Sequence, residues 1–165
     1  MQTVGLQKHE NASRSLKGSL LRYIPLLVWL ALISYASTGD FSAETTSRFV
    51  GPLLRWLFPK MSAQNMELAH MLVRKCAHFG LYAVLGVLAA RAFSTSSLRW
   101  LRRRWFTWSA VLIVAYAVID EYHQSFVTSR TGSPIDSLID IVGGLFALVA
   151  YRFLRFGDTR ANPSP

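Results

Sequence analysis

The sequence holds few charged residues and only one cysteine. Charged residues make up 16% of the 165 residues, below the roughly 25% usual in soluble domains, while apolar residues make up 52%. The lone Cys76 excludes an intramolecular disulfide, so cysteine usage does not identify the redox compartment. We interpret this thiol as a small core residue on a packed helix rather than as a reactive group. No phosphate-binding glycine loop, cysteine pair, internal repeat or low-complexity segment is present in the sequence.

Four apolar segments account for the hydrophobic composition. They run from Tyr23 to about Thr38, from about Met71 to Phe93, from Trp105 to Ile119, and from Ser137 to Phe156. Their uncharged runs are shorter than the about 20 residues that span a bilayer, but aromatic residues at their ends are typical of membrane anchors. The segments are apolar on all faces, which favours membrane spans over the alternative of a soluble helical bundle. The sequence therefore predicts an all-α, membrane-spanning bundle of about four transmembrane helices.

Polar tails flank this region and lower the mean hydropathy to +0.27. We expect a cytoplasmic N-terminal tail at 1–19, a transmembrane domain at 20–156 and a disordered cytoplasmic C-terminal tail at 157–165. The basic lead of the first segment also fits a cleaved signal peptide. A retained span is favoured, because Pro25 and Trp29 lie within the segment and three more apolar segments follow.

The net charge of +9 is unevenly distributed along the chain. In a soluble protein it would suggest nucleic-acid binding, but here the basic residues flank apolar segments, so no nucleic-acid partner is expected. If the N-terminal tail, the 91–104 loop and the C-terminal tail share one side, that side holds twelve of the 18 Lys and Arg residues. The positive-inside rule then places both termini and this loop in the cytoplasm. Segments 39–70 and 120–136 face outward, and anionic lipid headgroups would attract the Arg99–Arg104 cluster.

The outer segment after the first span contains an amphipathic stretch at 45–58. Its apolar residues near one helical face are Phe49, Leu53, Trp56 and Leu57. We expect a short helix lying in the membrane interface, broken or restarted at Pro52 and ended by Pro59. A loop packed over the bundle is an equally weighted and compatible alternative. Ser62 is then a good N-cap for a long second helix.

Ionisable residues enter the apolar segments near the outer ends of the second, third and fourth helices. Lys75, His78 and Tyr82 lie on one face of the second helix, because residues three, four or seven apart share a face. A carboxylate near the hydrocarbon region is unfavourable by roughly 2.5–3.5 kcal/mol unless it is paired, so Asp120 and Asp140 need partners. The candidate site residues are Lys75, His78, Tyr82, Asp120, Glu121, Gln124, Arg130, Asp136 and Asp140.

Two interpretations of this cluster stay open. In the first, ion pairs such as Asp140 with Lys75 or Arg130 only hold three helices together. In the second, which we favour for His78 and the two acidic residues that end the third helix, the cluster has a function, because intramembrane ionisable residues are functional candidates by default.

The same residues carry a resemblance to a known family. The pattern K-x-x-H-F-x-x-Y at Lys75–Tyr82, D-E-x-x-Q at Asp120–Gln124 and R-x-x-x-x-x-D at Arg130–Asp136 resembles the VanZ-like family of bacterial membrane proteins, over residues from about 23 to 155. This resemblance implies a small helical protein of the cell envelope, located in the cytoplasmic membrane. It also implies a link to antibiotic resistance, since the founding member is associated with low-level resistance to teicoplanin. The family commonly carries Asn where this sequence has Asp140, so an extra negative charge is present here.

The first functional hypothesis is recognition without catalysis. The protein would bind an anionic lipid-linked or glycopeptide-related ligand, such as a lipid-linked envelope precursor, at the outer leaflet. Lys75 and Arg130 would hold the anion, and membrane lipids would be the other partners. The predicted ligand-binding residues are Lys75, Tyr82, Gln124, Arg130, Asp136 and Asp140.

The alternative is a membrane-embedded enzyme that acts on a lipid phosphate or acyl group. His78 would form an acid–base pair with Asp120 or Glu121, because His titrates near neutrality and a carboxylate can orient it. A metal site built on these residues is less favoured, since their spacing matches no recognised signature, and we expect no metal and no cofactor. A transporter is also less favoured, because four helices make a thin pathway. Gly143 and Gly144 permit close helix approach within the bundle or between protomers.

Overall fold

The computed structural model describes residues 21–38, 43–126 and 133–156. Within these ranges the chain forms six α-helices and no strand, so the prediction of an all-α fold is confirmed. The helices are α2 (Ile24–Ala36), α3 (Ala43–Leu57), α4 (Ala63–Ser94), α5 (Arg99–Arg103), α6 (Trp105–Gln124) and α7 (Pro134–Phe156). Arg130 and the predicted terminal tails lie outside the described residues.

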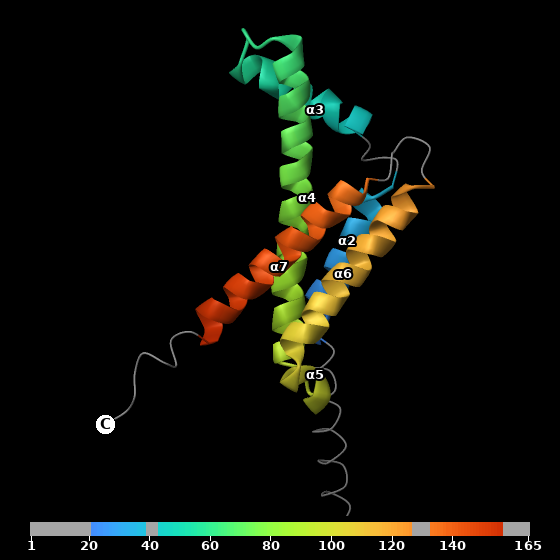
Figure 1. Ribbon diagram of the computed structural model, residues 1–165, viewed down its shortest axis with the longest axis vertical. Helices are drawn as coiled ribbons and strands as arrows, with labels where there is room; N and C mark the ends of the chain where they lie inside the picture. Colours follow the sequence, from blue (N-terminus) through green and yellow to red (C-terminus); the bar gives the residue numbers. More distant parts are fainter. Residues whose placement is uncertain (1–20, 39–42, 127–132, 157–165) are drawn as a thin grey trace, which may run out of the picture.

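The long helix α4 is the centre of the fold, and α2, α6 and α7 all pack against it (Figure 1). Successive long helices alternate in direction. Tyr23 at the start of α2 meets Ser96 just after the end of α4, and Ser37 after the end of α2 meets Gln124 at the end of α6. The bundle therefore has two distinct ends, one with α5 and the other with the end of α6 and the start of α7.

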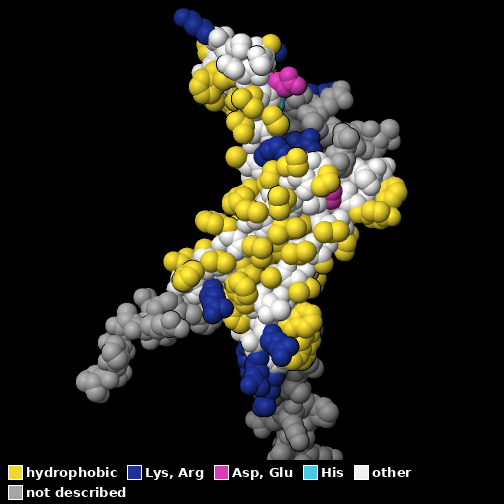
Figure 2. All heavy atoms as spheres, viewed as in Figure 1, with side chains coloured by type: hydrophobic (Ala, Val, Ile, Leu, Met, Phe, Trp, Pro, Cys, Tyr) yellow, Lys and Arg dark blue, Asp and Glu magenta, His cyan; other side chains and the backbone are white. Residues whose placement is uncertain are grey.

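Two of the helices, α4 and α7, are long and apolar enough to cross a membrane. Helix α2 is apolar but has only 13 residues. Helix α6 has 20 residues but is not among the helices that meet the criterion. Large apolar side chains are exposed along the bundle, which Figure 2 shows as a broad hydrophobic surface between more polar ends. Two of the four predicted spans thus meet this criterion among the described helices.

Close contact between α4 and α7 depends on glycine. A Cβ atom at Gly86 of α4 would collide with the backbone carbonyl oxygen of Gly144 in α7, and one at Gly143 would collide with the carbonyl oxygen of Phe79. A Cβ atom at Gly144 would also lie 2.5 Å from Ile113 Cγ2 of α6. These glycines therefore permit close helix approach within the bundle, the first of the two uses predicted for Gly143 and Gly144.

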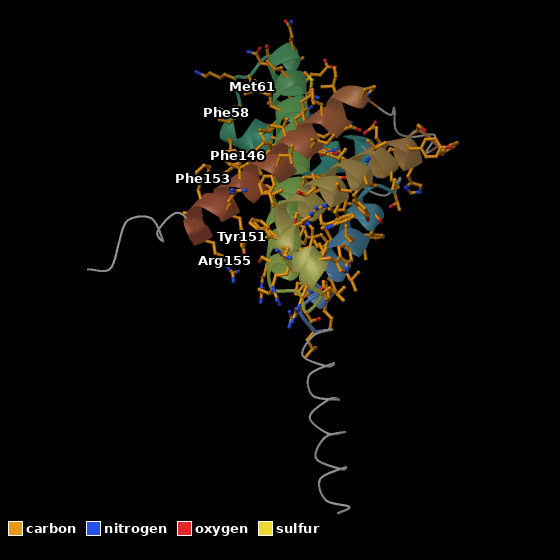
Figure 3. All side chains as sticks on the ribbon, turned by 60° about the horizontal axis from the view of Figure 1, so that its bottom comes forward. Phe58, Met61, Phe146, Tyr151, Phe153 and Arg155 are labelled. Atoms are coloured by element: carbon orange, nitrogen blue, oxygen red, sulfur yellow. The ribbon has the colours of Figure 1, made fainter. Side chains whose placement is uncertain are left out.

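The ends of α3 and α4 follow local chemistry. The Ser62 side chain accepts a hydrogen bond from the Asn65 N–H at 3.3 Å, which confirms the predicted N-cap of α4. Helix α3 continues through Pro52, so the expected break there is wrong, and it ends at Leu57. Phe58 follows directly, in the turn that leads to α4 (Figure 3).

The prediction for the cysteine is also wrong. Cys76 is exposed on α4 instead of packed in the core. The core is formed by other residues of α4 together with residues of α2, α6 and α7: Leu26, Ile33, Tyr82, Leu85, Ala89, Ala90, Ala92, Ile113, Ala117 and Leu148.

Candidate functional site

Ion pairs join α4 to the first turn of α7. Lys75 Nζ lies 2.9 Å from Asp136 Oδ1, and Arg74 Nη2 lies 3.4 Å from Asp136 Oδ2. The Asp136 side chain is only 11% exposed, whereas the two cations are about one-third exposed. One nearly buried carboxylate therefore has two basic partners, and Lys75 makes the shorter of the two contacts.

One turn further along both helices, His78 meets Asp140. His78 Nδ1 lies 3.1 Å from Asp140 Oδ1, and the Asp140 side chain is 1% exposed. Asp140 therefore pairs with His78 and not with Lys75, and the carboxylate partner of His78 comes from α7 and not from the end of α6. When Nδ1–H donates to this carboxylate, Nε2 is left as a hydrogen-bond acceptor.

The end of α6 adds a second polar group. Gln124 Nε2 donates to Asp120 Oδ2 at 3.1 Å and to Ser37 Oγ at 3.4 Å. All three residues are buried. This chain of hydrogen bonds joins the ends of α2 and α6 and supplies Asp120 with a neutral donor.

Glu121 connects α6 to the start of α7. Its Oε1 accepts a hydrogen bond from the backbone N–H of Ser133, the residue just before α7. Its Oε2 is buried and has no hydrogen-bond partner among the described residues. Glu121 therefore stabilises the junction between α6 and α7.

A pocket of about 230 Å³ opens between α2, α4 and α6 beside these groups. It is lined by Ile33, Ala36, Ser37, Val73, Arg74, Ala77, His78, Leu81, Tyr82 and Asp120. Tyr82 is 1% exposed, and its hydroxyl makes no hydrogen bond of normal geometry within the described ranges, although it interacts electrostatically with Asp120. The Tyr82 hydroxyl and the Asp120 carboxylate lie together on the pocket wall, where they can hydrogen-bond to a polar group of a ligand.

The pocket combines four kinds of polar chemistry on apolar walls. Arg74 supplies a permanent cation, His78 an imidazole oriented by a buried carboxylate, Tyr82 a hydroxyl and Asp120 a carboxylate. Such a set can bind an anionic group and can also transfer a proton. In the described part of the chain, no three His, Cys, Asp or Glu side chains are grouped so that they could hold a metal ion.

Seven of the nine residues predicted for the site come together as expected at this end of the bundle. Six of them are linked in pairs, Lys75 to Asp136, His78 to Asp140 and Gln124 to Asp120. Glu121 lies at the neighbouring junction, and Arg130 lies outside the described residues. Their roles in binding or catalysis stay predictions.

Sequence reasoning missed the apolar walls of the pocket and two of its polar residues, Arg74 and Ser37. Arg74 precedes His78 by four residues, so helical spacing alone places it on the same face of α4. Ser37 follows the end of α2 and carries no sequence signal that distinguishes it from Ser34.

The chain matches a family of known proteins. The family model of VanZ/LLP1 matches residues 20–155, which include every helix described above except the last residue of α7. Searches of curated proteins and of solved structures find no match. The chain therefore belongs to the VanZ/LLP1 family.

Proposed function

We propose that this chain is a multi-pass protein of the bacterial cytoplasmic membrane that recognises an anionic, lipid-linked envelope ligand at the outer leaflet. The observation that carries the proposal is the pocket between α2, α4 and α6, where Arg74, His78 and Tyr82 converge. Its volume of about 230 Å³ is below the about 300–1,000 Å³ of pockets for whole drug-sized ligands. It suits one phosphate or carboxylate group, while the apolar remainder of the ligand stays in the bilayer.

In this proposal α2 and α6 also cross the membrane, and both termini are cytoplasmic. The alternating helix directions and the arginine-rich α5 support this orientation through the positive-inside rule. Helix α3 lies in the outer interface, supported by the exposed Leu53, Trp56 and Leu57 on its surface. The pocket then opens near the outer headgroups.

Arg74 has the main part in ligand binding here, because it lines the pocket and Lys75 does not. Replacing Arg74 by Gln removes the charge, and Lys75 still pairs with Asp136 at 2.9 Å, so the α4–α7 junction keeps an ion pair. A hydrogen bond to a charged group contributes about 1.5–3 kcal/mol, so binding should weaken by roughly 10- to 150-fold.

Binding of a polyprenyl phosphate to the purified protein in nanodiscs tests this expectation. Arg48→Gln is the matched control, because it removes the same charge from an exposed position on α3 outside the pocket. Equal affinities of wild type and Arg74→Gln would rule out the pocket as the anion site. In cells, we expect the wild type to raise the teicoplanin concentration that inhibits a susceptible host, and Arg74→Gln to raise it less.

A second candidate function is hydrolysis of a lipid phosphate or acyl ester. The specific observation that favours it is the His78–Asp140 pair at 3.1 Å, with His78 lining the pocket. A buried carboxylate on Nδ1 fixes the tautomer in which Nε2 accepts a proton from an attacking water. Arg74 would stabilise the negative charge that develops on the phosphate or the ester oxygen.

Phosphate release from a polyprenyl diphosphate by the purified protein separates the two functions. Under hydrolysis, His78→Ala should abolish turnover and leave binding of polyprenyl phosphate nearly unchanged. Full turnover by His78→Ala would exclude this mechanism. Wild-type binding without turnover would leave recognition as the function.

A further inference from the structure

The end of the bundle opposite the polar pocket carries an apolar groove beside a cluster of arginines. The groove encloses about 540 Å³ between α2, α4, α5 and α6. We propose that it holds one acyl chain of an anionic glycerophospholipid of the cytoplasmic leaflet, with the phosphate of that lipid against the arginines of α5. This site is separate from the outer pocket and does not depend on the ligand bound there.

The walls of the groove suit a hydrocarbon chain. Trp100 of α5 and Trp108 of α6 form an edge-to-face pair with ring centroids 5.1 Å apart. Tyr23 lines the groove from α2, and its hydroxyl is already bonded to the buried Ser96 at 2.7 Å. The lining is almost entirely apolar, so a polar peptide or a sugar placed there would lose hydrogen bonds to water without replacement. A flexible apolar chain carries no such penalty.

The groove is also open to the surroundings that supply such a chain. Leu98 and Val111 line it and are 51% and 50% exposed. In a membrane-embedded bundle these side chains face lipid. Trp100 is 55% exposed, which is typical of tryptophan at the boundary between headgroups and hydrocarbon.

The charges beside the groove lack internal counterions. Arg99, Arg103 and Arg104 are exposed, and none of them forms an ion pair with another residue of the described ranges. The acidic residues of those ranges all lie in α3, in the first half of α4, or near the α6–α7 junction at the other end. Figure 2 shows Lys and Arg side chains gathered at the α5 end, and Figure 3 turns that end forward. A bound anion would supply the missing negative charge.

Two further arginines support the same site. Arg102 Nη1 donates to the backbone carbonyl of Ser96 at 3.1 Å, which fixes α5 against the end of α4 beside the groove. The Nε atom of Arg22, next to Tyr23, is buried and has no hydrogen-bond partner within the described ranges. Arg22 is thus a further basic residue at this end of the bundle, next in sequence to the groove-lining Tyr23.

The test measures lipids retained by the full-length protein. The protein is extracted from vesicles with equal amounts of phosphatidylglycerol and phosphatidylcholine of the same chain length, and bound lipids are counted by native mass spectrometry. We expect phosphatidylglycerol to be retained in preference to phosphatidylcholine. Since each basic residue near an anionic surface contributes a factor of about 5, Arg99→Gln combined with Arg103→Gln should lower this preference by roughly 25-fold.

A charge-matched control and a groove-filling variant complete the test. Arg48→Gln combined with Lys60→Gln removes two exposed charges from the other end and should keep the preference. Ala115→Phe fills the groove and should reduce retention of both lipids. The proposal is overturned if the wild type retains the two lipids equally, or if the preference survives the loss of Arg99 and Arg103. The first of these comparisons uses the wild type alone, so it does not depend on the folding of a variant.

Discussion

Replacement of Gly86 by alanine tests the closest helix contact in the bundle. The new methyl group would collide with the Gly144 carbonyl oxygen and would lie 3.2 Å from the Gly144 carbonyl carbon. Because these are backbone atoms of α7, no side-chain rotation can relieve the contact, and the two helices must move apart. Inserting a methyl group into such a packed site destabilises proteins by about 1–3 kcal/mol.

The matched control is Gly80→Ala in the same helix. A Cβ atom at Gly80 would meet nothing within 4 Å, so alanine there only gains helix propensity, worth about 1 kcal/mol. That gain is common to both variants and cancels in their difference. We therefore expect Gly86→Ala to be less stable than Gly80→Ala by about 1–3 kcal/mol, or roughly 2–4 °C in Tm for each kcal/mol.

Thermal unfolding in detergent, followed by far-ultraviolet circular dichroism, measures this difference. Gly80→Ala should melt at or above the wild type, and Gly86→Ala below it. If Gly86→Ala melts as high as Gly80→Ala, then α4 and α7 do not approach through this glycine, and the explanation of their close packing fails.

Three further changes test single interactions. Asp136→Asn leaves Lys75 without its counterion at 2.9 Å. Because both side chains are partly buried, we expect a larger loss of Tm than for a pair on the surface, and an unchanged Tm would contradict this expectation. Ser62→Ala removes the acceptor for the Asn65 N–H and should weaken the first turn of α4 by about 1 kcal/mol, seen as faster amide exchange confined to that turn. Trp29→Phe removes an indole N–H bond of 2.9 Å to a backbone carbonyl of α4, for a loss of about 1 kcal/mol by thermal unfolding, with retention of full stability as the opposing result.

Much of the helical architecture was predictable, because it depends on local chemistry. Apolar runs identified the four apolar helices α2, α4, α6 and α7, and a serine at the right spacing identified the start of α4. The continuation of α3 through Pro52 was missed, since the sequence shows where a helix is weakened but not whether neighbouring contacts compensate. The exposure of Cys76 was also missed, because a helix that is apolar on every face does not reveal which face meets its neighbours.

The members of the polar cluster were predictable, but their pairing was not. Spacing places Lys75 and His78 on one face of α4, and Asp136 and Asp140 on one face of α7. Which cation meets which carboxylate depends on how far the two helices are displaced along each other. That displacement is fixed by the contact of Gly86 with α7, a tertiary feature without a local signal.

The unequal lengths of neighbouring helices have a consequence for the surrounding bilayer. At 1.5 Å per residue, the 13-residue α2 is about 20 Å long and the 32-residue α4 about 48 Å, against a hydrocarbon thickness of about 30 Å. In the proposed arrangement, where both helices cross the membrane, a flat bilayer does not match both lengths, and thinning of the lipid beside α2 would reduce the mismatch there. The pocket opens on this α2 flank, and in the proposed orientation such thinning would bring the headgroups of outer-leaflet lipids closer to His78.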